Sequence, residues 1–199
     1  MGDFLFFTHF FSTLNKTFFM ILKKGNILIA KPHKPSTKTY NKAVVFIAEY
    51  SAKGSIGFIL NTPSGYKIKD LLPEINSDFN IYIGGEEESG SLYFLHSVPN
   101  LIQNSVKICD NVYWGGNFSV VEELLKKNQL KETDIRFFLG YSNWGIDCLD
   151  NEISDNHWLI SPKNDSVFNT LNNDWHAQIV EHYPELAYWI NAPENPLYN

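Results

Sequence analysis

The side chains that could do chemistry are concentrated between Ile135 and Pro162. Cys148 is a possible thiol nucleophile, and Asp147, Asp150 and Glu152 could supply a pair of carboxylates for acid–base catalysis. Cys148 falls off the apolar face of the helix expected here, so it either packs against a second surface or is an accessible thiol. No histidine stands beside it in the sequence, and carboxylates on a helix are usually only solvated, so the pattern favours no catalytic site.

The sequence carries none of the common catalytic or metal-binding motifs. It has no GxxxxGK[ST] phosphate loop, no GxSxG nucleophile elbow and no HExxH zinc helix among its histidines. Its two cysteines, Cys109 and Cys148, have neither a metal-ligand spacing nor a disulfide framework, which is typical of reduced thiols in a cytoplasm. We therefore expect no metal and no cofactor.

A binding depression is the alternative to catalysis. Glycines at strand ends let a ligand approach the backbone, amide and imidazole side chains offer directional hydrogen bonds without a permanent charge, and tryptophan offers a flat surface. The same glycines could serve only tight turns, and the tryptophan could be a plug under the helix. The candidate residues of this depression are Asn61, Pro63, Gly84, Gly85, His96, Gly140, Asn143, Trp144, Gly145 and Glu152. They predict a site for an unknown small molecule or protein partner.

The elements that must hold these residues form one compact unit. Residues 136–139 are rich in β-favouring types, and the two glycines around Ser-Asn in residues 140–145 predict a turn. Ile146, Leu149 and Ile153 follow at i, i+3 and i+7, which predicts a short helix with these side chains facing inward.

Short strands account for most of the remaining pattern. We expect a β-hairpin from residues 43–49 and 56–60, and pairing between residues 81–83 and 91–96. A capping box at residues 119–122, with Ser followed by Glu, predicts the start of a helix. Further strands are expected at 27–30, 106–109, 112–114 and 158–160. Further helices are expected at 68–75, where Pro73 shortens or kinks the helix, and after the cap residue Asp174.

The order of these elements predicts the fold class. About eight short strands and four to five short helices show no regular βαβ alternation, so a doubly wound sheet is not expected. We predict an α+β fold, in which a compact, strongly bent and mainly antiparallel β-sheet carries the helices. A chain of 199 residues with 44% hydrophobic and 19% charged residues fits one globular domain.

The first 22 residues differ from the rest. Phenylalanines crowd the segment before Met20 among polar residues, and the regular pattern begins only after it. The segment lacks the features of a secretory signal, and it is too short and too polar to span a bilayer. We predict an N-terminal extension at 1–22 outside the core and a single domain at 23–199. The extension is either an over-extended reading frame or a disordered or loosely docked arm.

The charge distribution argues against direct recognition of nucleic acid. The formal net charge is -6 at pH 7, and Arg136 is the only arginine. The lysines from Lys23 to Lys42 lie in a segment without Asp or Glu, which indicates a solvated edge or, alternatively, a phosphate-binding surface. We predict no specific nucleic-acid binding by the isolated protein and no association with a membrane.

Several motifs together resemble a known family. GNILIAKP, SIGFILNTP, IYIGG with LYFLH, VYWGG and FLGYSNWGIDCLDNEISDNHWL look like the YqgE/AlgH family of bacterial proteins, in the same order. The resemblance extends from about Gly25 to Trp175, and the last motif is the specific one. Asp147 and Cys148 replace a Gly and a Gln of the family pattern. The VYWGG segment and the tail are similar to the Bacteroidetes branch. The residues that match the last motif are Gly140, Tyr141, Trp144, Leu149, Glu152, Ile153 and Trp158.

The resemblance implies a compact domain of coiled, branching β-sheets in a cytoplasmic protein, with no established enzymatic activity. Some members of the family are called transcriptional regulators. Our first expectation is a non-enzymatic regulatory or binding protein of unknown ligand. The alternatives are a transcriptional regulator that acts through a partner rather than by reading DNA directly, and a hydrolase or thiol-dependent enzyme with an unrecognised site.

Overall fold

The structure is a computed structural model of the chain, and it describes residues 21–32, 38–161, 167–168 and 175–192. Residues 1–20 of the expected extension and the expected helix cap Asp174 lie outside the described residues. Leu22, at the end of the expected extension, is 6% exposed and packs in an apolar cluster. Within the described residues, no helix has the length and apolarity to cross a membrane.

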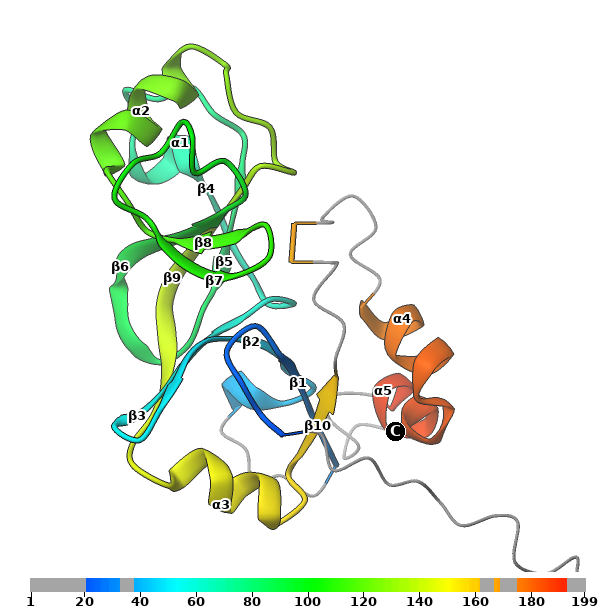
Figure 1. Cartoon of the computed structure of the whole chain (residues 1–199). Helices are drawn as coiled ribbons and strands as arrows, with labels where there is room; N and C mark the ends of the chain where they lie inside the picture. The colour runs from blue at the N-terminus through cyan, green and yellow to red at the C-terminus, as the bar shows by residue number, and fades with distance from the viewer. Residues whose placement is uncertain (1–20, 33–37, 162–166, 169–174, 193–199) are drawn as a thin grey trace, which may run out of the picture.

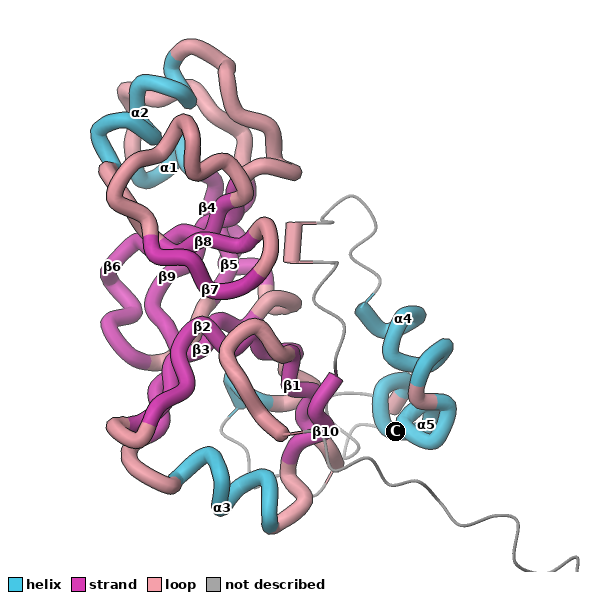
Figure 2. The backbone as a smooth tube through the Cα atoms, viewed as in Figure 1, coloured by secondary structure: helices cyan, strands magenta, loops and turns pink. Residues whose placement is uncertain are grey.

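In the described residues, ten strands form one branched and mainly antiparallel sheet, which confirms the predicted α+β class (Figures 1 and 2). The main path of the sheet is β10-β1-β2-β3-β9-β6-β8-β7, and β5 joins β9 beside this path and carries β4. The strands are β1 (Ile27–Ala30), β2 (Val44–Ser51), β3 (Gly54–Ile59), β4 (Pro63–Lys67), β5 (Asn80–Ile83), β6 (Glu87–His96), β7 (Val106–Cys109), β8 (Val112–Trp114), β9 (Ile135–Trp144) and β10 (Trp158–Ser161).

The helices are short and lie at the ends and side of the sheet. In Figure 1, α1 and α2 lie at one end of the molecule and α3 at the other, while α4 and α5 lie beside β10. The α-helices are α1 (Ile68–Leu71), α2 (Phe118–Lys126), α3 (Cys148–Ser154), α4 (Trp175–His182) and α5 (Ala187–Asn191), and the 3₁₀ turns are η1 (Lys38–Tyr40) and η2 (Pro184–Leu186).

Strand β9 belongs to the main path of the sheet and also carries the side branch formed by β5 and β4. Its first half pairs with β6 on one edge and with the parallel strand β5 on the other, and its second half pairs with β3. Side chains alternate across a strand, so a long strand can serve more than one core. Phe137, Phe138 and Trp144 accordingly belong to three separate apolar clusters. β9 therefore joins all three clusters.

The hairpin of β2 and β3 is confirmed, but the expected pairing of residues 81–83 with 91–96 is wrong. Ile81 lies opposite Phe137 on one edge of β9, and Phe94 lies opposite the same residue on the other edge. The strand β9 therefore separates the two segments. Neighbouring segments look like natural partners in a sequence because nothing local reveals a third strand that comes later in the chain.

The ends of two helices can be compared with the expectations. The helix expected at 68–75 is the single turn α1, and it ends before Pro73, as the expected shortening by proline requires. Helix α2 has Asn117 as its N-cap, whose Oδ1 accepts the N–H of Ser119 at 3.1 Å. The expected capping box with Ser119 as the cap is therefore wrong.

Candidate functional site

The glycine-rich stretch 140–145 is largely strand and not the expected turn, because β9 continues through it to residue 144. Gly140 has a φ of +65°, and a Cβ on it would lie 2.5 Å from the carbonyl oxygen of Glu87. A Cβ on Gly85 would lie 2.1 Å from the carbonyl carbon of Tyr141. These glycines therefore let the backbone after β5 pass directly against β9, which is a structural role.

Asn61 and Pro63 also have structural roles. The Oδ1 atom of Asn61 accepts the N–H of Val44 at 2.9 Å, and its Nδ2 atom donates to the carbonyl oxygen of Lys42 at 2.9 Å. Pro63 begins β4 opposite Tyr82. The amide of Asn61 thus supplies hydrogen bonds to the backbone at the start of β2.

His96 lies away from the other candidate residues. It is fully buried opposite Ile135, the first residue of β9, whereas Trp144 is the last, and ten residues of strand span about 30 Å. Its Nδ1 atom accepts the N–H of Val98 at 3.2 Å, so Nε2 carries the proton and donates to the carbonyl oxygen of Gly115 at 3.1 Å. Burial lowers the pKa of His96. The histidine is a neutral structural residue here.

A carboxylate between two tryptophans forms the centre of the remaining group. Glu152 Oε2 accepts the Nε1–H of Trp144 at 3.3 Å and the Nε1–H of Trp158 at 2.6 Å. The ring of Tyr40 lies 6.4 Å from each indole ring, and the two indoles are 6.2 Å apart at a steep angle. We call these four residues the Glu152 cluster. It joins η1, the end of β9, α3 and the start of β10.

The spacing of residues in α3 explains why a carboxylate points inward. Leu149 is 1% exposed and belongs to the same apolar cluster as both tryptophans. Glu152 and Ile153 follow at i+3 and i+4, so they share its face of the helix. Ile146, which precedes α3, is 65% exposed, so the prediction that it faces inward is wrong. The inward position of Glu152 could have been inferred from its spacing to Leu149.

Carboxylates and tyrosines surround the Glu152 cluster. The hydroxyl of Tyr40 lies near the buried Ser142, whose Oγ donates to the carbonyl oxygen of Gly84 at 3.1 Å. Burial raises the pKa of Tyr40, and the negative charges of Glu86, Glu152 and Glu87 raise it further. Among the candidate residues, Gly84, Gly85 and Gly140 lie together against the middle of β9, and Trp144 and Glu152 lie together at its end. Asn143 and Gly145 are exposed on either side of Trp144.

Two further tyrosines hold carboxylates at the surface. Tyr50 donates to Asp150 Oδ1 of α3 at 2.6 Å, and Tyr93 donates to Glu88. The hydrogen bond to Glu88 raises the pKa of Tyr93 to about 12, and the bond to Asp150 raises that of Tyr50. We call the group near the start of β6 the acidic tyrosine surface, and Tyr50 with Asp150 forms a separate pair at α3. The acidic tyrosine surface consists of Tyr40, Tyr93, Glu86, Glu87 and Glu88. Sequence reasoning missed it because these residues come from separate elements.

The site carries no recognisable reaction centre. Cys148 is exposed at the start of α3, so the accessible-thiol alternative is the one observed. In the described part of the chain, no three histidine, cysteine or acidic residues are grouped so that they could hold a metal ion. What the arrangement offers is fixed negative charge and aromatic surface.

Replacing Glu152 with glutamine tests the Glu152 cluster. The variant keeps the shape of the side chain but removes the charge that strengthens two indole hydrogen bonds, so we expect a loss of about 1 to 2 kcal/mol in the free energy of unfolding. Urea denaturation followed by tryptophan fluorescence measures this loss. The exposed Glu49→Gln is the control and should change stability by less than about 0.5 kcal/mol. Equal stabilities of the two variants would contradict the role of the carboxylate.

The sequence matches a protein family and several of its members. A family model described as AlgH-like matches residues 27–186. A UPF0301 protein of Cytophaga hutchinsonii is 36% identical over 146 residues, which cover 72% of this chain and 80% of that protein. The UPF0301 protein CT0663 of Chlorobaculum tepidum is 28% identical over 181 residues, which cover 89% of this chain and 96% of that protein.

Two solved structures share the fold. The crystal structure of protein DIP2367 from Corynebacterium diphtheriae matches with a TM-score of 0.69 at 19% identity, over 86% of this chain and 93% of that chain. The solution structure of the AlgH protein from Pseudomonas aeruginosa matches with a TM-score of 0.66 at 22% identity, over 85% of this chain and 94% of that chain.

Proposed function

The chain belongs to the AlgH-like family, and we propose that it is a non-enzymatic, cytoplasmic binding protein that recognises a basic segment of a partner protein. The observation that carries the proposal is the acidic tyrosine surface, where Glu86, Glu87 and Glu88 are exposed at the start of β6 and Tyr93 donates a hydrogen bond to Glu88. A regulatory role would follow from occupancy of this surface by the partner. The two free cysteines agree with a reducing compartment.

The chemistry of the surface suits lysine or arginine side chains. Glu86, Glu87 and Glu88 are exposed in a row where β6 begins. Carboxylates attract cations, and tyrosine rings add cation–π contacts at modest cost in side-chain entropy. Because the hydroxyl of Tyr93 already fixes Glu88, less ordering is needed when a partner binds.

A role in transcription would be indirect on this proposal. Direct reading of DNA bases relies mainly on exposed arginine, lysine, asparagine and glutamine side chains, and the only arginine of this chain, Arg136, is 1% exposed. A net charge of -6 also opposes the approach of a phosphate backbone. Both observations favour a regulator that acts through a basic protein partner over one that contacts DNA.

Binding of a fluorescein-labelled nona-arginine peptide, followed by anisotropy, tests the proposal. We expect salt-sensitive binding to the parent protein, and a loss of affinity of about five-fold in the double variant Glu86→Gln/Glu87→Gln, since each exposed charge pair contributes up to about 1 kcal/mol. The matched control is Glu122→Gln/Glu123→Gln on α2, which lies at the end of the molecule away from α3 (Figure 1). Absence of binding by the parent, or equal losses in both double variants, would contradict the proposal.

A further inference from the structure

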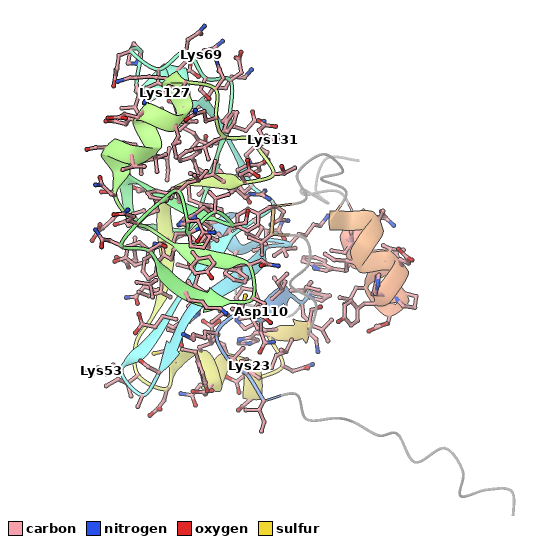
Figure 3. The ribbon with its side chains drawn as sticks, turned by 45° about the horizontal axis from the view of Figure 1, so that its top comes forward. Lys23, Lys53, Lys69, Asp110, Lys127 and Lys131 are labelled. Carbon is pink, nitrogen blue, oxygen red and sulfur yellow. The ribbon has the colours of Figure 1, made fainter. Side chains whose placement is uncertain are left out.

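A groove lies apart from the acidic tyrosine surface, between the turn before β1 and the β7–β8 hairpin. Its volume is about 510 Å³, which is within the range of sites for small molecules. Figure 3 shows Lys23 and Asp110 near one another on the two walls. The lining residues are Lys23, Lys24, Gly25, Asn26, Ile108, Cys109 and Asp110.

Hydrogen bonds fix the wall formed by the turn. The N–H of Gly25 donates to the carbonyl oxygen of Ile47 at 2.7 Å, and Asn26 Oδ1 accepts the N–H of Lys23 at 2.9 Å. Gly25 has a φ of +89°, and a Cβ on it would lie 2.8 Å from the Cβ of Cys109, so the turn packs directly on the hairpin. The groove is therefore bounded by positioned backbone.

The groove carries a net positive charge in a protein that is negative as a whole. Lys23 and Lys24 are exposed, and Lys24 Nζ crosses to the other wall, where it donates to the carbonyl oxygen of Lys107 at 3.2 Å. The one carboxylate of the lining, Asp110, pairs with Lys107 at 3.3 Å. Lys23 and Lys24 thus remain in excess at the groove.

The base of the groove is apolar. Ile108 is 4% exposed and belongs to the largest apolar cluster, and Cys109 packs against that cluster. An occupant would therefore meet ammonium groups on one side and hydrocarbon on the other. A fully hydrated inorganic ion does not use the apolar side, and a neutral hydrocarbon does not use the lysines.

We propose that this groove binds a small organic anion, a molecule with an apolar body and one phosphate, sulfonate or carboxylate group. The anionic group lies between Lys23 and Lys24, which act as point charges, and the body lies against Ile108 and Cys109. The proposal gives a role to the two lysines at the start of the described chain, and it does not depend on the acidic tyrosine surface.

Two dyes test the proposal on the full chain. One is 8-anilinonaphthalene-1-sulfonate, and the other is N-phenyl-1-naphthylamine, which has the same rings without the sulfonate. We expect the sulfonated dye to bind with enhanced fluorescence and the neutral dye to bind at least five-fold more weakly. Lys23→Gln/Lys24→Gln should weaken binding of the sulfonated dye at least five-fold. Lys127→Gln/Lys131→Gln, at the far end of the molecule in Figure 3, should leave it unchanged.

Competition then identifies the anionic group. Displacement of the dye by excess inorganic phosphate or acetate supports the proposal and shows which group is preferred. Equal affinities for the two dyes, or equal losses in the two double variants, contradict the proposal. Backbone amide shifts of Gly25 and Asn26 on titration of the sulfonated dye locate the bound molecule, and unchanged amides there would overturn the assignment.

Discussion

Replacing Gly85 with alanine is expected to lower the free energy of unfolding by at least about 3 kcal/mol. The added Cβ would lie 2.1 Å from the carbonyl carbon of Tyr141, 2.2 Å from its oxygen and 2.3 Å from the nitrogen of Ser142. These atoms are backbone of β9 and cannot move aside as a flexible side chain could. In a chain of this size, the loss corresponds to a melting temperature lower by about 6 to 12 °C, measurable by circular dichroism.

Gly90→Ala is the matched control for this clash. Gly90 lies five residues after Gly85, but it is exposed and has no neighbouring atom within 4 Å of an added Cβ. The control should therefore be soluble and melt within about 2 °C of the parent. A Gly85→Ala variant that melted as high as the control would show that the close passage against β9 is not required.

The second large effect is expected at the buried Arg136. Its guanidinium donates to the carbonyl oxygen of Val167 at 3.0 Å and to that of Leu60, and it lies 3.8 Å from the ring centre of Tyr82. Burial lowers its pKa to about 10, which still leaves the group charged at neutral pH. Arg136→Ala removes the stacking contact and leaves two carbonyl groups without these donors, so we expect a loss of about 3 to 5 kcal/mol.

Arg136→Met separates the two parts of this effect. Methionine fills much of the space over Tyr82 but donates no hydrogen bond, and it avoids the cost of burying a charge. We expect it to recover about 1 to 2 kcal/mol relative to alanine in urea denaturation. An alanine variant within about 1 kcal/mol of the parent would show that the guanidinium is not what holds Val167 to the sheet.

Local patterns predicted the local parts of this fold. The β2–β3 hairpin, the strand β10 and the short helix α3 follow from apolar runs and spacing, because each is decided by neighbours in the sequence. The glycines in residues 140–145 were misread because a glycine that permits a turn and one that permits close backbone contact look alike. Strand β4 was missed since its Pro63 and Gly65 are typical of turns.

The candidate site was predictable only in part, because some of its residues are neighbours in the sequence and others are not. Trp144 and Glu152 lie eight residues apart, and the structure brings them together as members of one motif. Tyr40 joins them from a distant 3₁₀ turn, and the carboxylates of residues 86–88 come from the start of β6. His96 shares the chemical type of a site residue but sits at the other end of β9, which no spacing in the sequence could reveal.

The position of β9 in the chain has a consequence for synthesis on the ribosome. Strands β3, β5 and β6 are all made before β9, yet each completes its pairing only with β9, and β1 pairs with β10 near the end of the described chain. Pairings of such long sequence separation form slowly. We expect the nascent chain to expose unpaired strand edges to chaperones and proteases until Trp144 has left the exit tunnel.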